Sequence, residues 1–309
     1  MKYKINAYPI LEFGKRKDIY GNPHQEDSIY PPLGIDASES RLFMVCDGMG
    51  GHDSGEIASQ TVCAAISLSI LNDGHDSDGI FTNMDLLGAL YSAYIALDEK
   101  DNGAQKKMGT TLAMLKLHNS GATIAHIGDS RVYQIRPGKT EKETEILFMT
   151  EDHSLVNSLV KAGEMTPEEA RHSKKRNIIT RAMQPGVDRC EADIALITDI
   201  KPGDYFYLCS DGMLEQDEME DGSALKRIFS NEIPSLEQKV KILQGATANN
   251  SDNHSAYIIQ ILEVDNKNGE SDSTSGSVES SKSSFINKIL SHLKKIKRDC
   301  KYTKEPPLG

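Results

Sequence analysis

Apolar residues recur along the chain in short runs that are bounded by turn residues. Runs of this kind predict seven β-strands, at 42–46, 110–117, 122–127, 132–135, 145–149, 204–209 and 256–264. Because the runs are short and several of them alternate between apolar and polar residues, we expect antiparallel rather than parallel sheet.

Other segments have the spacing and the capping residues of helices. Capping-box pairs precede two apolar stretches: Asp53 and Glu56 before 57–71, and Ser235 and Gln238 before 240–248. A third stretch, 84–100, repeats apolar residues at helical spacing: Leu86, Leu90, Tyr94 and Leu97. Thr166 followed by Pro167 predicts the start of a further helix.

The order of these elements indicates the fold class. Groups of strands are preceded, separated and followed by helices, which favours an α+β fold over a doubly wound sheet. Residues 266–284 are poor in apolar residues and rich in Ser, Asn and Gly, which predicts a flexible linker. We therefore expect a globular domain at 1–265, a linker at 266–284 and a tail at 285–309.

Composition adds a charge asymmetry to this picture. The 309 residues carry a net charge of −11, but from Phe285 onward seven Lys or Arg residues stand against Asp299 and Glu305. The body of the protein is therefore more acidic than the total suggests, which argues against nucleic acid as a partner. Abundant carboxylates are also what a hard-cation site requires.

The cysteines and the N-terminus indicate the compartment. The five cysteines lack CxxC spacing, which predicts reduced thiols rather than a disulfide framework. The first residues have neither the apolar core nor the cleavage site of a secretory signal. No stretch looks apolar enough over the length needed to cross a bilayer. We expect a cytoplasmic monomer.

Four aspartates stand at the ends of predicted strands. Asp47, Asp129 and Asp211 follow strands in the segments VCDG, IGDS and LCSDG, and Asp252 in NNSDNHS precedes one. Glu26 and Asp27 stand together in the segment QEDS, just after turn residues. Any one Asp-Gly pair is more simply a turn. Several carboxylates brought together would repel one another unless a cation lay between them, and oxygen ligands alone favour Mg²⁺ or Mn²⁺ over zinc.

Five segments, CDGMGGHDSGEIAS, MGTTLA, AHIGDSRVYQI, LCSDGM and SDNHS, resemble in their order the metal-dependent protein phosphatases of type 2C, and look most like the bacterial branch. The resemblance extends from about residue 3 to 264 and includes a flap-like segment at 151–183. It implies a four-layer α-β-β-α sandwich of two antiparallel sheets flanked by helices. It also implies a serine/threonine phosphatase that acts on phosphoproteins and opposes a cognate kinase.

The resemblance further implies roles for individual residues. Asp47 would bridge two Mn²⁺ or Mg²⁺ ions, and the Gly48 carbonyl would complete the coordination of one of them. Asp211 and Asp252 would hold the other ion. Two such ions supply a bridging hydroxide that attacks the phosphomonoester directly, without a covalent intermediate. Gly48 lacks a side chain because its backbone must reach a metal.

Three more acidic residues acquire roles in the same way. Glu26 and Asp27 would act through metal-bound waters. Asp129 matches a residue that helps to hold a third ion together with the aspartate at Asp211. All of these carboxylates are oxygen donors, as a site for two or three hard cations requires.

The sequence departs from the family pattern at two positions. Met49 stands where eukaryotic members have a histidine that is proposed as the general acid. The phosphate-binding arginine that usually precedes the Glu-Asp pair is missing at its usual offset, where Asn22 stands. The basic run Lys15, Arg16 and Lys17 contains the nearest substitutes.

The missing arginine keeps a second hypothesis open. It is that of a non-catalytic relative that retains the fold and binds a phosphoprotein partner. A third hypothesis keeps the enzyme but narrows its substrate to a small regulator, such as an anti-sigma-factor antagonist.

The tail carries its own pattern. At helical spacing, one face holds four apolar residues surrounded by lysines: Phe285, Ile289, Leu293 and Ile296. Segment 285–301 is therefore either a solvated terminus or a helix that docks on a partner or on a membrane surface.

Overall fold

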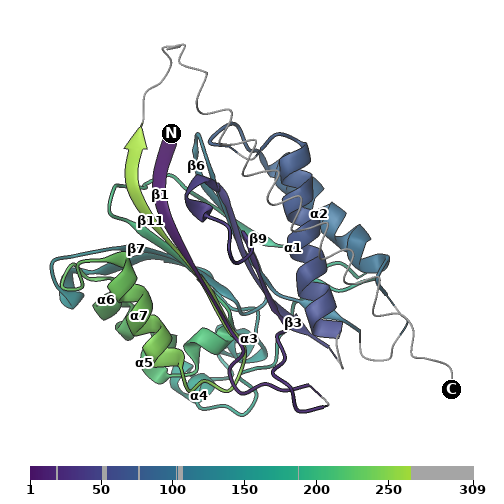
Figure 1. Ribbon diagram of the computed structural model, residues 1–309. Helices are drawn as coiled ribbons and strands as arrows, with labels where there is room; N and C mark the ends of the chain where they lie inside the picture. Colours follow the sequence, from purple (N-terminus) through teal and green to yellow (C-terminus); the bar gives the residue numbers. More distant parts are fainter. Residues whose placement is uncertain are drawn as a thin grey trace.

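Two antiparallel sheets stack face to face, and helices cover the outer face of each sheet (Figure 1). The computed structural model describes residues 1–265 except 19, 51–53, 76, 102, 104–106 and 187. The four-layer α-β-β-α architecture expected from the sequence is confirmed. The expected linker and tail lie outside the described residues.

The first sheet places the N-terminal strand beside the last one. Its order is β1 (Lys2–Glu12), β11 (His254–Asp265), β10 (Tyr205–Cys209), β7 (Arg131–Arg136) and β8 (Glu145–Met149). The second sheet has the order β2 (Asp27–Tyr30), β3 (Leu42–Met49), β5 (Leu112–His118), β6 (Gly121–Ile127) and β9 (Asp193–Ile197), and β4 (Gly109–Thr110) pairs with β3. All the pairings between these strands are antiparallel.

The helices form the two outer layers. The second sheet is covered by α1 (Ser54–Asn72), on which α2 (Asn83–Asp98) packs. The first sheet is covered by α5 (Asp217–Glu220), α6 (Ser223–Phe229) and α7 (Leu236–Thr247). Two short helices, α3 (Leu155–Lys161) and α4 (Pro167–Arg171), lie at one end of the sandwich. Short 3-10 turns are η1 (Ala37–Glu39), η2 (Glu141–Glu143) and η3 (Asp211–Leu214).

The apolar run in β3 is continuous because both faces of the strand are buried. Phe43 and Val45 belong to the core between the two sheets. Met44 and Cys46 point the other way and pack under α1. A strand that is covered on both faces needs no polar alternation, and this run delivers the residues that follow it to a fixed position.

All seven predicted strands are present, with bounds shifted by a few residues, and the predicted helices correspond to α1, α2, α4 and α7. Thr166 caps α4 in a capping box with Glu169. The predicted cap of α1 at Asp53 lies outside the described residues. The sequence pattern does not predict β1, β2 and β9 or the short helices α3, α5 and α6.

One expectation about membrane spans needs correction. By length and composition, α1 is apolar enough to cross a bilayer. Its apolar residues instead pack against β3 on one side and α2 on another, as in the core helix of a globular domain. A helix covered on two sides is apolar around much of its circumference, which explains why it passes such a test.

Candidate functional site

Strand pairing brings the first two acidic residues together. Asp27 at the start of β2 and Asp47 near the end of β3 are direct partners in the antiparallel register. The backbone of Asp47 is fixed by Thr111, whose hydroxyl accepts from the Asp47 N–H at 2.9 Å and whose own N–H donates to the Asp47 carbonyl at 2.9 Å. Neighbouring strands therefore place both carboxylates rigidly.

The other sheet contributes two further carboxylates from its own strand ends. Asp211 begins η3 directly after β10, and Asp252 stands two residues before β11. Asp211 acts electrostatically on Asp47. Asp129, which follows β6, also acts electrostatically on Asp47. The predicted meeting of strand-end aspartates at one edge of the sandwich is therefore present.

Gly48 stands where β3 and the start of α1 come closest. Its N–H donates to the carbonyl oxygen of Glu26 at 3.1 Å. A Cβ at this position would lie 2.1 Å from the carbonyl oxygen of Gly55 and 2.5 Å from that of Glu26. No side chain fits between these backbones, so a glycine is needed for the Asp47 segment to lie this close to Gly55 and Glu26.

Removal from water and mutual repulsion make these carboxyl groups weak acids. Burial raises the pKa of Asp27 to about 7, although the Ser255 and Ser210 hydroxyls donate to its Oδ2 at 2.7 and 2.9 Å. Burial, followed by neighbouring carboxylates, raises the pKa of Asp47 and of Asp129 well above the usual range.

Three oxygens of this cluster fit a bound cation. The Oδ1 atoms of Asp27, Asp129 and Asp211 are buried and accept no hydrogen bond. A buried carboxylate oxygen without a partner is costly, and a hard divalent cation would satisfy it. No group of three or more His, Cys, Asp or Glu side chains in the described part of the chain is spaced to hold an ion as it stands.

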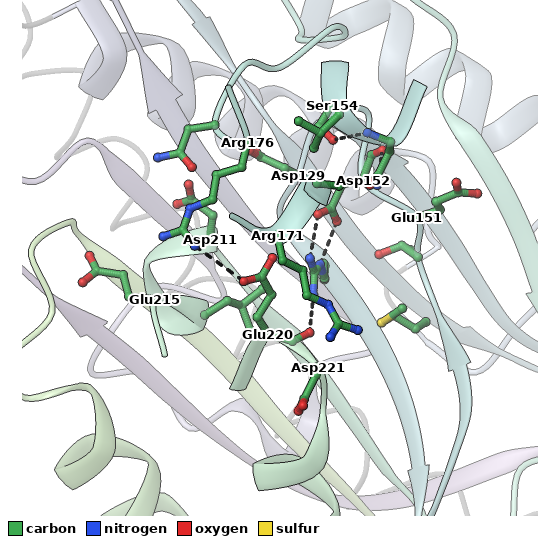
Figure 2. A pocket seen from close by; sticks show the side chains of 18 of the residues that line it. Asp129, Glu151, Asp152, Ser154, Arg171, Arg176, Asp211, Glu215, Glu220 and Asp221 are labelled. Atoms are coloured by element: carbon green, nitrogen blue, oxygen red, sulfur yellow. Dashed lines mark hydrogen bonds and ion pairs between the residues drawn. The ribbon is translucent and has the colours of Figure 1, made fainter. Parts of the chain in front are cut away.

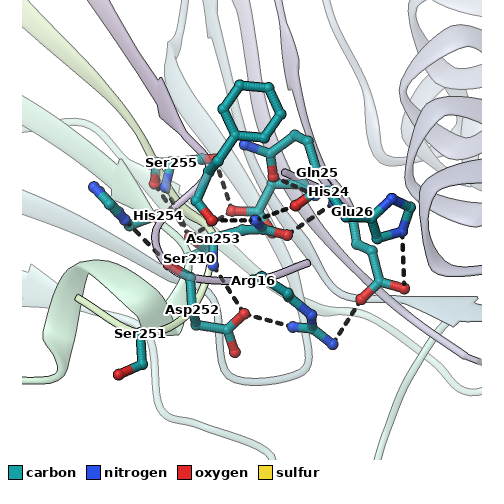
Figure 3. Close-up of polar contacts among 12 residues, drawn as sticks. Arg16, His24, Gln25, Glu26, Ser210, Ser251, Asp252, Asn253, His254 and Ser255 are labelled. Atoms are coloured by element: carbon teal, nitrogen blue, oxygen red, sulfur yellow. Dashed lines mark hydrogen bonds and ion pairs between the residues drawn. The ribbon is translucent and has the colours of Figure 1, made fainter. Parts of the chain in front are cut away.

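A guanidinium group lies at the rim of this cluster. Arg16 contacts Glu26 Oε2 through Nη2 at 2.6 Å and Asp252 Oδ1 through Nη1 at 2.5 Å, as Figure 3 shows. Burial lowers the pKa of Arg16, but Asp252, Glu26 and Asp47 together outweigh it and raise the pKa above the usual value. The arginine therefore stays charged beside the acidic residues.

Arg16 is one of the three basic residues that the sequence offered as substitutes for the arginine missing at its usual offset, and it lies beside Glu26 and Asp252. Asn22, which stands at the usual offset, lies in an exposed turn where its side chain and backbone N–H donate to Asp18. The chain makes a turn between Arg16 and Glu26, closed by a bridge between Lys17 and Pro23. The residues Gly21, Asn22 and Pro23 are the sequence signal for this turn.

Asn253 contacts the segments on both sides of this turn (Figure 3). Its Nδ2 donates to the carbonyl oxygens of Phe13 and His24, at 2.8 and 2.7 Å, and its Oδ1 accepts from the Glu26 N–H at 2.9 Å. The side-chain amide of Asn253 thus holds the segments that contain Arg16 and Glu26 in place beside β11. Sequence analysis did not single out Asn253, since its role depends on contacts that are distant along the chain.

The Asp129 segment has a similar support. His153 Nδ1 accepts from the Gly128 N–H at 3.1 Å, and the His153 N–H donates to the Gly128 carbonyl at 2.8 Å. The other ring nitrogen lies 3.1 Å from Asp193 Oδ2. His153 therefore orients the turn that precedes Asp129. No sequence pattern had identified His153.

A cavity of about 370 Å³ opens beside Asp129, Asp211 and Asp252 (Figure 2). One wall comes from α3 and α4, within the segment expected to be flap-like, and the opposite wall from η3 and α5. Arg131 in this cavity is held by Asp152 through two bonds of 2.7 Å. Arg176 lies 3.7 Å from Glu220.

Comparisons with known proteins agree with the geometry. A family model described as "Protein phosphatase 2C" matches residues 16–247. Protein phosphatase PhpP of Streptococcus pneumoniae is 30% identical over 231 residues, which cover 72% of this chain and 87% of that protein. The serine/threonine protein phosphatase PstP of Mycobacterium tuberculosis is 32% identical over 72% of this chain and 40% of its own length.

Solved structures show the same relationship. A crystal structure of Mycobacterium tuberculosis PstP superposes with a TM-score of 0.66 and 27% identity, covering 84% of this chain and 99% of that one. The catalytic domain of PstP in complex with two manganese ions has a TM-score of 0.64 and 26% identity over 84% of this chain and 99% of that one.

Proposed function

Because this chain belongs to the protein phosphatase 2C family, we propose that it is a metal-dependent protein serine/threonine phosphatase. The observation that carries the proposal is the set of three buried carboxylate oxygens, on Asp27, Asp129 and Asp211, that have no hydrogen-bond partner. The resemblance to the family assigns Asp129 and Asp211 to metal binding and Asp27 to contact through metal-bound water.

The residues present fit Mn²⁺ or Mg²⁺. Asp47, the Gly48 carbonyl, Asp211 and Asp252 would hold two ions, and Asp129 with Asp211 would hold a third. When bound, such ions supply a hydroxide for direct attack on phosphorus and neutralise charge on the phosphate oxygens. All the donors are oxygens, which favours these ions over zinc.

The chain's own groups would bind and orient the substrate. Arg16 is placed to donate two hydrogen bonds to the non-bridging oxygens of a phosphate group, in exchange for one of its present carboxylate partners. Asn253 holds Arg16 indirectly, through the carbonyls of Phe13 and His24 on the two sides of the turn. No side chain in this arrangement has to form a covalent bond to phosphorus.

The adjacent cavity supports a polypeptide substrate. At about 370 Å³ and directly beside Asp129, it has room for side chains that flank a phosphoserine or phosphothreonine. Phosphoproteins made by a cognate kinase are therefore the proposed substrates. A small regulator as substrate, a cytoplasmic location and a monomeric state all stay predictions.

The non-catalytic hypothesis depended on the absence of a phosphate-binding arginine at its usual offset. The guanidinium of Arg16, which contacts Glu26 and Asp252, supports the enzyme instead. The acidic residues expected to hold metals are also all present and close to one another.

The test combines metal binding with hydrolysis of p-nitrophenyl phosphate. We expect activity with Mn²⁺ or Mg²⁺ and none in excess EDTA. Asp47→Asn should lower kcat by orders of magnitude and weaken Mn²⁺ binding in calorimetry, whereas Asp73→Asn, an exposed aspartate beyond α1, should change neither. Substantial turnover in EDTA, or near wild-type kcat in Asp47→Asn, would contradict the proposal.

A further inference from the structure

The outer face of α2 carries large apolar residues that are open to solvent. The exposed fractions are 74% for Met84, 50% for Leu87, 61% for Tyr91 and 37% for Ile95. Their spacing of three, four and four residues aligns them in one row along the helix. We call these four residues the α2 stripe.

The α2 stripe lies on a different face of the helix from the one that packs in the core. The opposite face packs on α1 through Leu86, Leu90 and Leu97, which are almost fully buried. A helix whose inner face is already satisfied has no local reason to place four large apolar residues outside. Scattered exposed apolar residues are ordinary, but an aligned row of them marks a contact surface.

The tail contains a matching row. Phe285, Ile289, Leu293 and Ile296 are spaced by four, four and three residues, which is the spacing of the α2 stripe read in the reverse direction. Both rows span twelve residues, which is about 17 Å along a helix. An antiparallel pairing would therefore bring Ile296 to Met84, Leu293 to Leu87, Ile289 to Tyr91 and Phe285 to Ile95.

The described chain ends near the start of α2. Asp265, the last residue of β11, pairs with Lys2 of β1. The neighbouring Met1 ammonium donates to the Asn119 carbonyl, and the Asn119 N–H donates to the Gly79 carbonyl at 3.1 Å, four residues before Asn83. A chain of 19 Ser- and Gly-rich residues spans about 25 Å on average, which suffices to reach the α2 stripe.

The charges are complementary as well. Residues 73–101 contain seven Asp or Glu residues and one lysine, Lys100. Residues 285–301 contain six Lys or Arg residues and one acid, Asp299. In the antiparallel pairing, the basic cluster from Lys294 to Arg298 would lie over the N-terminal half of α2. Asp85 lies in this half, and α2 itself carries no basic residue.

From these observations we propose that residues 285–296 of the same chain form a helix that covers the α2 stripe in an antiparallel arrangement. Apolar contact would provide the main stabilisation, and the opposite charges would fix the direction of the tail helix. The inference uses no property of the metal site and does not depend on the proposed activity.

The chain contains no tryptophan, so Tyr91→Trp places a single fluorescent reporter on the α2 stripe. In the full chain we expect its emission to be blue-shifted and weakly quenched by acrylamide. Adding Ile289→Lys and Leu293→Lys should shift the emission to longer wavelength and strengthen quenching. Asn287→Lys with Ser291→Lys adds the same charge on the opposite face of the tail helix and should change neither.

A second reporter and a dilution series distinguish the tail from a second copy of the chain or a membrane as the cover of the α2 stripe. Tyr8→Trp, on β1, should not respond to the tail variants. If the Tyr91→Trp emission is solvent-like and indifferent to the tail variants, the proposal is wrong. It is equally wrong if the blue shift disappears on dilution, which indicates a second copy of the chain, or arises only with anionic vesicles, which indicates a membrane.

Discussion

At the scale of single residues, one positively charged side chain lies among the carboxylates of the candidate site. Arg16 is held by Glu26 and Asp252 at 2.6 and 2.5 Å, and both partners belong to the acidic cluster. The arginine therefore neutralises part of the repulsion among these carboxylates. In the proposed function, the same guanidinium would exchange a carboxylate partner for phosphate oxygens.

We predict that Arg16→Ala raises KM for p-nitrophenyl phosphate with a smaller effect on kcat, because the groups that hold the metals are retained. Losing a charge-assisted hydrogen-bonded pair costs about 1.5–3 kcal/mol. That is roughly ten- to a hundredfold in affinity. Lys15→Ala and Asn22→Ala are the controls and should leave KM unchanged. An unchanged KM in Arg16→Ala would mean that another group holds the phosphate.

A second residue-scale prediction concerns His118. Burial, followed by the Lys116 and N-terminal ammonium groups, lowers its pKa to about 4. The unfolded chain, with a histidine pKa near 6.5, therefore binds more protons between pH 4 and 6.5, and the free energy of unfolding falls as pH drops through this window. The loss from this residue is at most about 3 kcal/mol.

Urea unfolding of His118→Asn across this pH range checks the prediction. The variant should lose less stability than the wild type between pH 6.5 and 4, since the titrating ring is absent. His172→Asn, at the exposed C-terminal end of α4, should keep the wild-type pH dependence. Parallel curves for wild type and His118→Asn would contradict this assignment.

These residues mark the limit of sequence analysis at this scale. The strand-end aspartates were predictable because an apolar strand fixes the position of the residue that ends it. Arg16 could be named only as one of three basic residues at 15–17, because its selection depends on a contact with the distant Asp252. Asn253 and His153 act through contacts that only the folded chain creates, so no local pattern identifies them.

At the scale of elements, the site depends on how closely β3 approaches α1. Gly48 and Gly55 permit this approach, since a Cβ on Gly48 would overlap the Gly55 carbonyl oxygen at 2.1 Å. We predict that Gly48→Ala lowers the free energy of unfolding by about 1–3 kcal/mol, the usual cost of overpacking, and also lowers activity because the Asp47 segment must shift.

Gly245→Ala is the matched control for this prediction. Gly245 lies within α7, and nothing comes within 4 Å of a Cβ placed there. The added methyl group should raise the free energy of unfolding by about 0.5–1 kcal/mol, because alanine loses less backbone entropy in a helix. Equal effects of the two substitutions in urea unfolding would show that the close approach is unimportant.

The elements that the sequence failed to predict share a physical reason. β1 lies at the edge of the first sheet and includes Pro9, lysines and an asparagine, which lower its β-propensity. An edge strand tolerates proline because one side of its backbone needs no partner. Its formation depends on pairing with β11 at the other end of the domain, which a local pattern does not reveal.

At the scale of the whole molecule, two sheets with separate strand orders supply the two halves of one site. Asp27 and Asp47 come from the second sheet, and Asp211 and Asp252 from the ends of β10 and β11 in the first. The site therefore forms only when the sheets stack. The fold class was predictable from element order, but the register between the sheets was not, since side-chain packing in the common core sets it.

The last prediction separates the phosphatase domain from its tail. A chain ending at Asp265 retains every residue of the candidate site, so its kcat for p-nitrophenyl phosphate should equal that of the full chain. It would also leave the α2 stripe uncovered, and we expect it to self-associate at high concentration in sedimentation velocity. Adding Leu87→Lys and Tyr91→Lys should restore the monomer.

If the tail were instead a membrane anchor, only the full chain would co-sediment with anionic vesicles, and salt would weaken that binding. A docked tail requires a different outcome: both chains co-sediment with vesicles to the same extent, and the shorter chain self-associates.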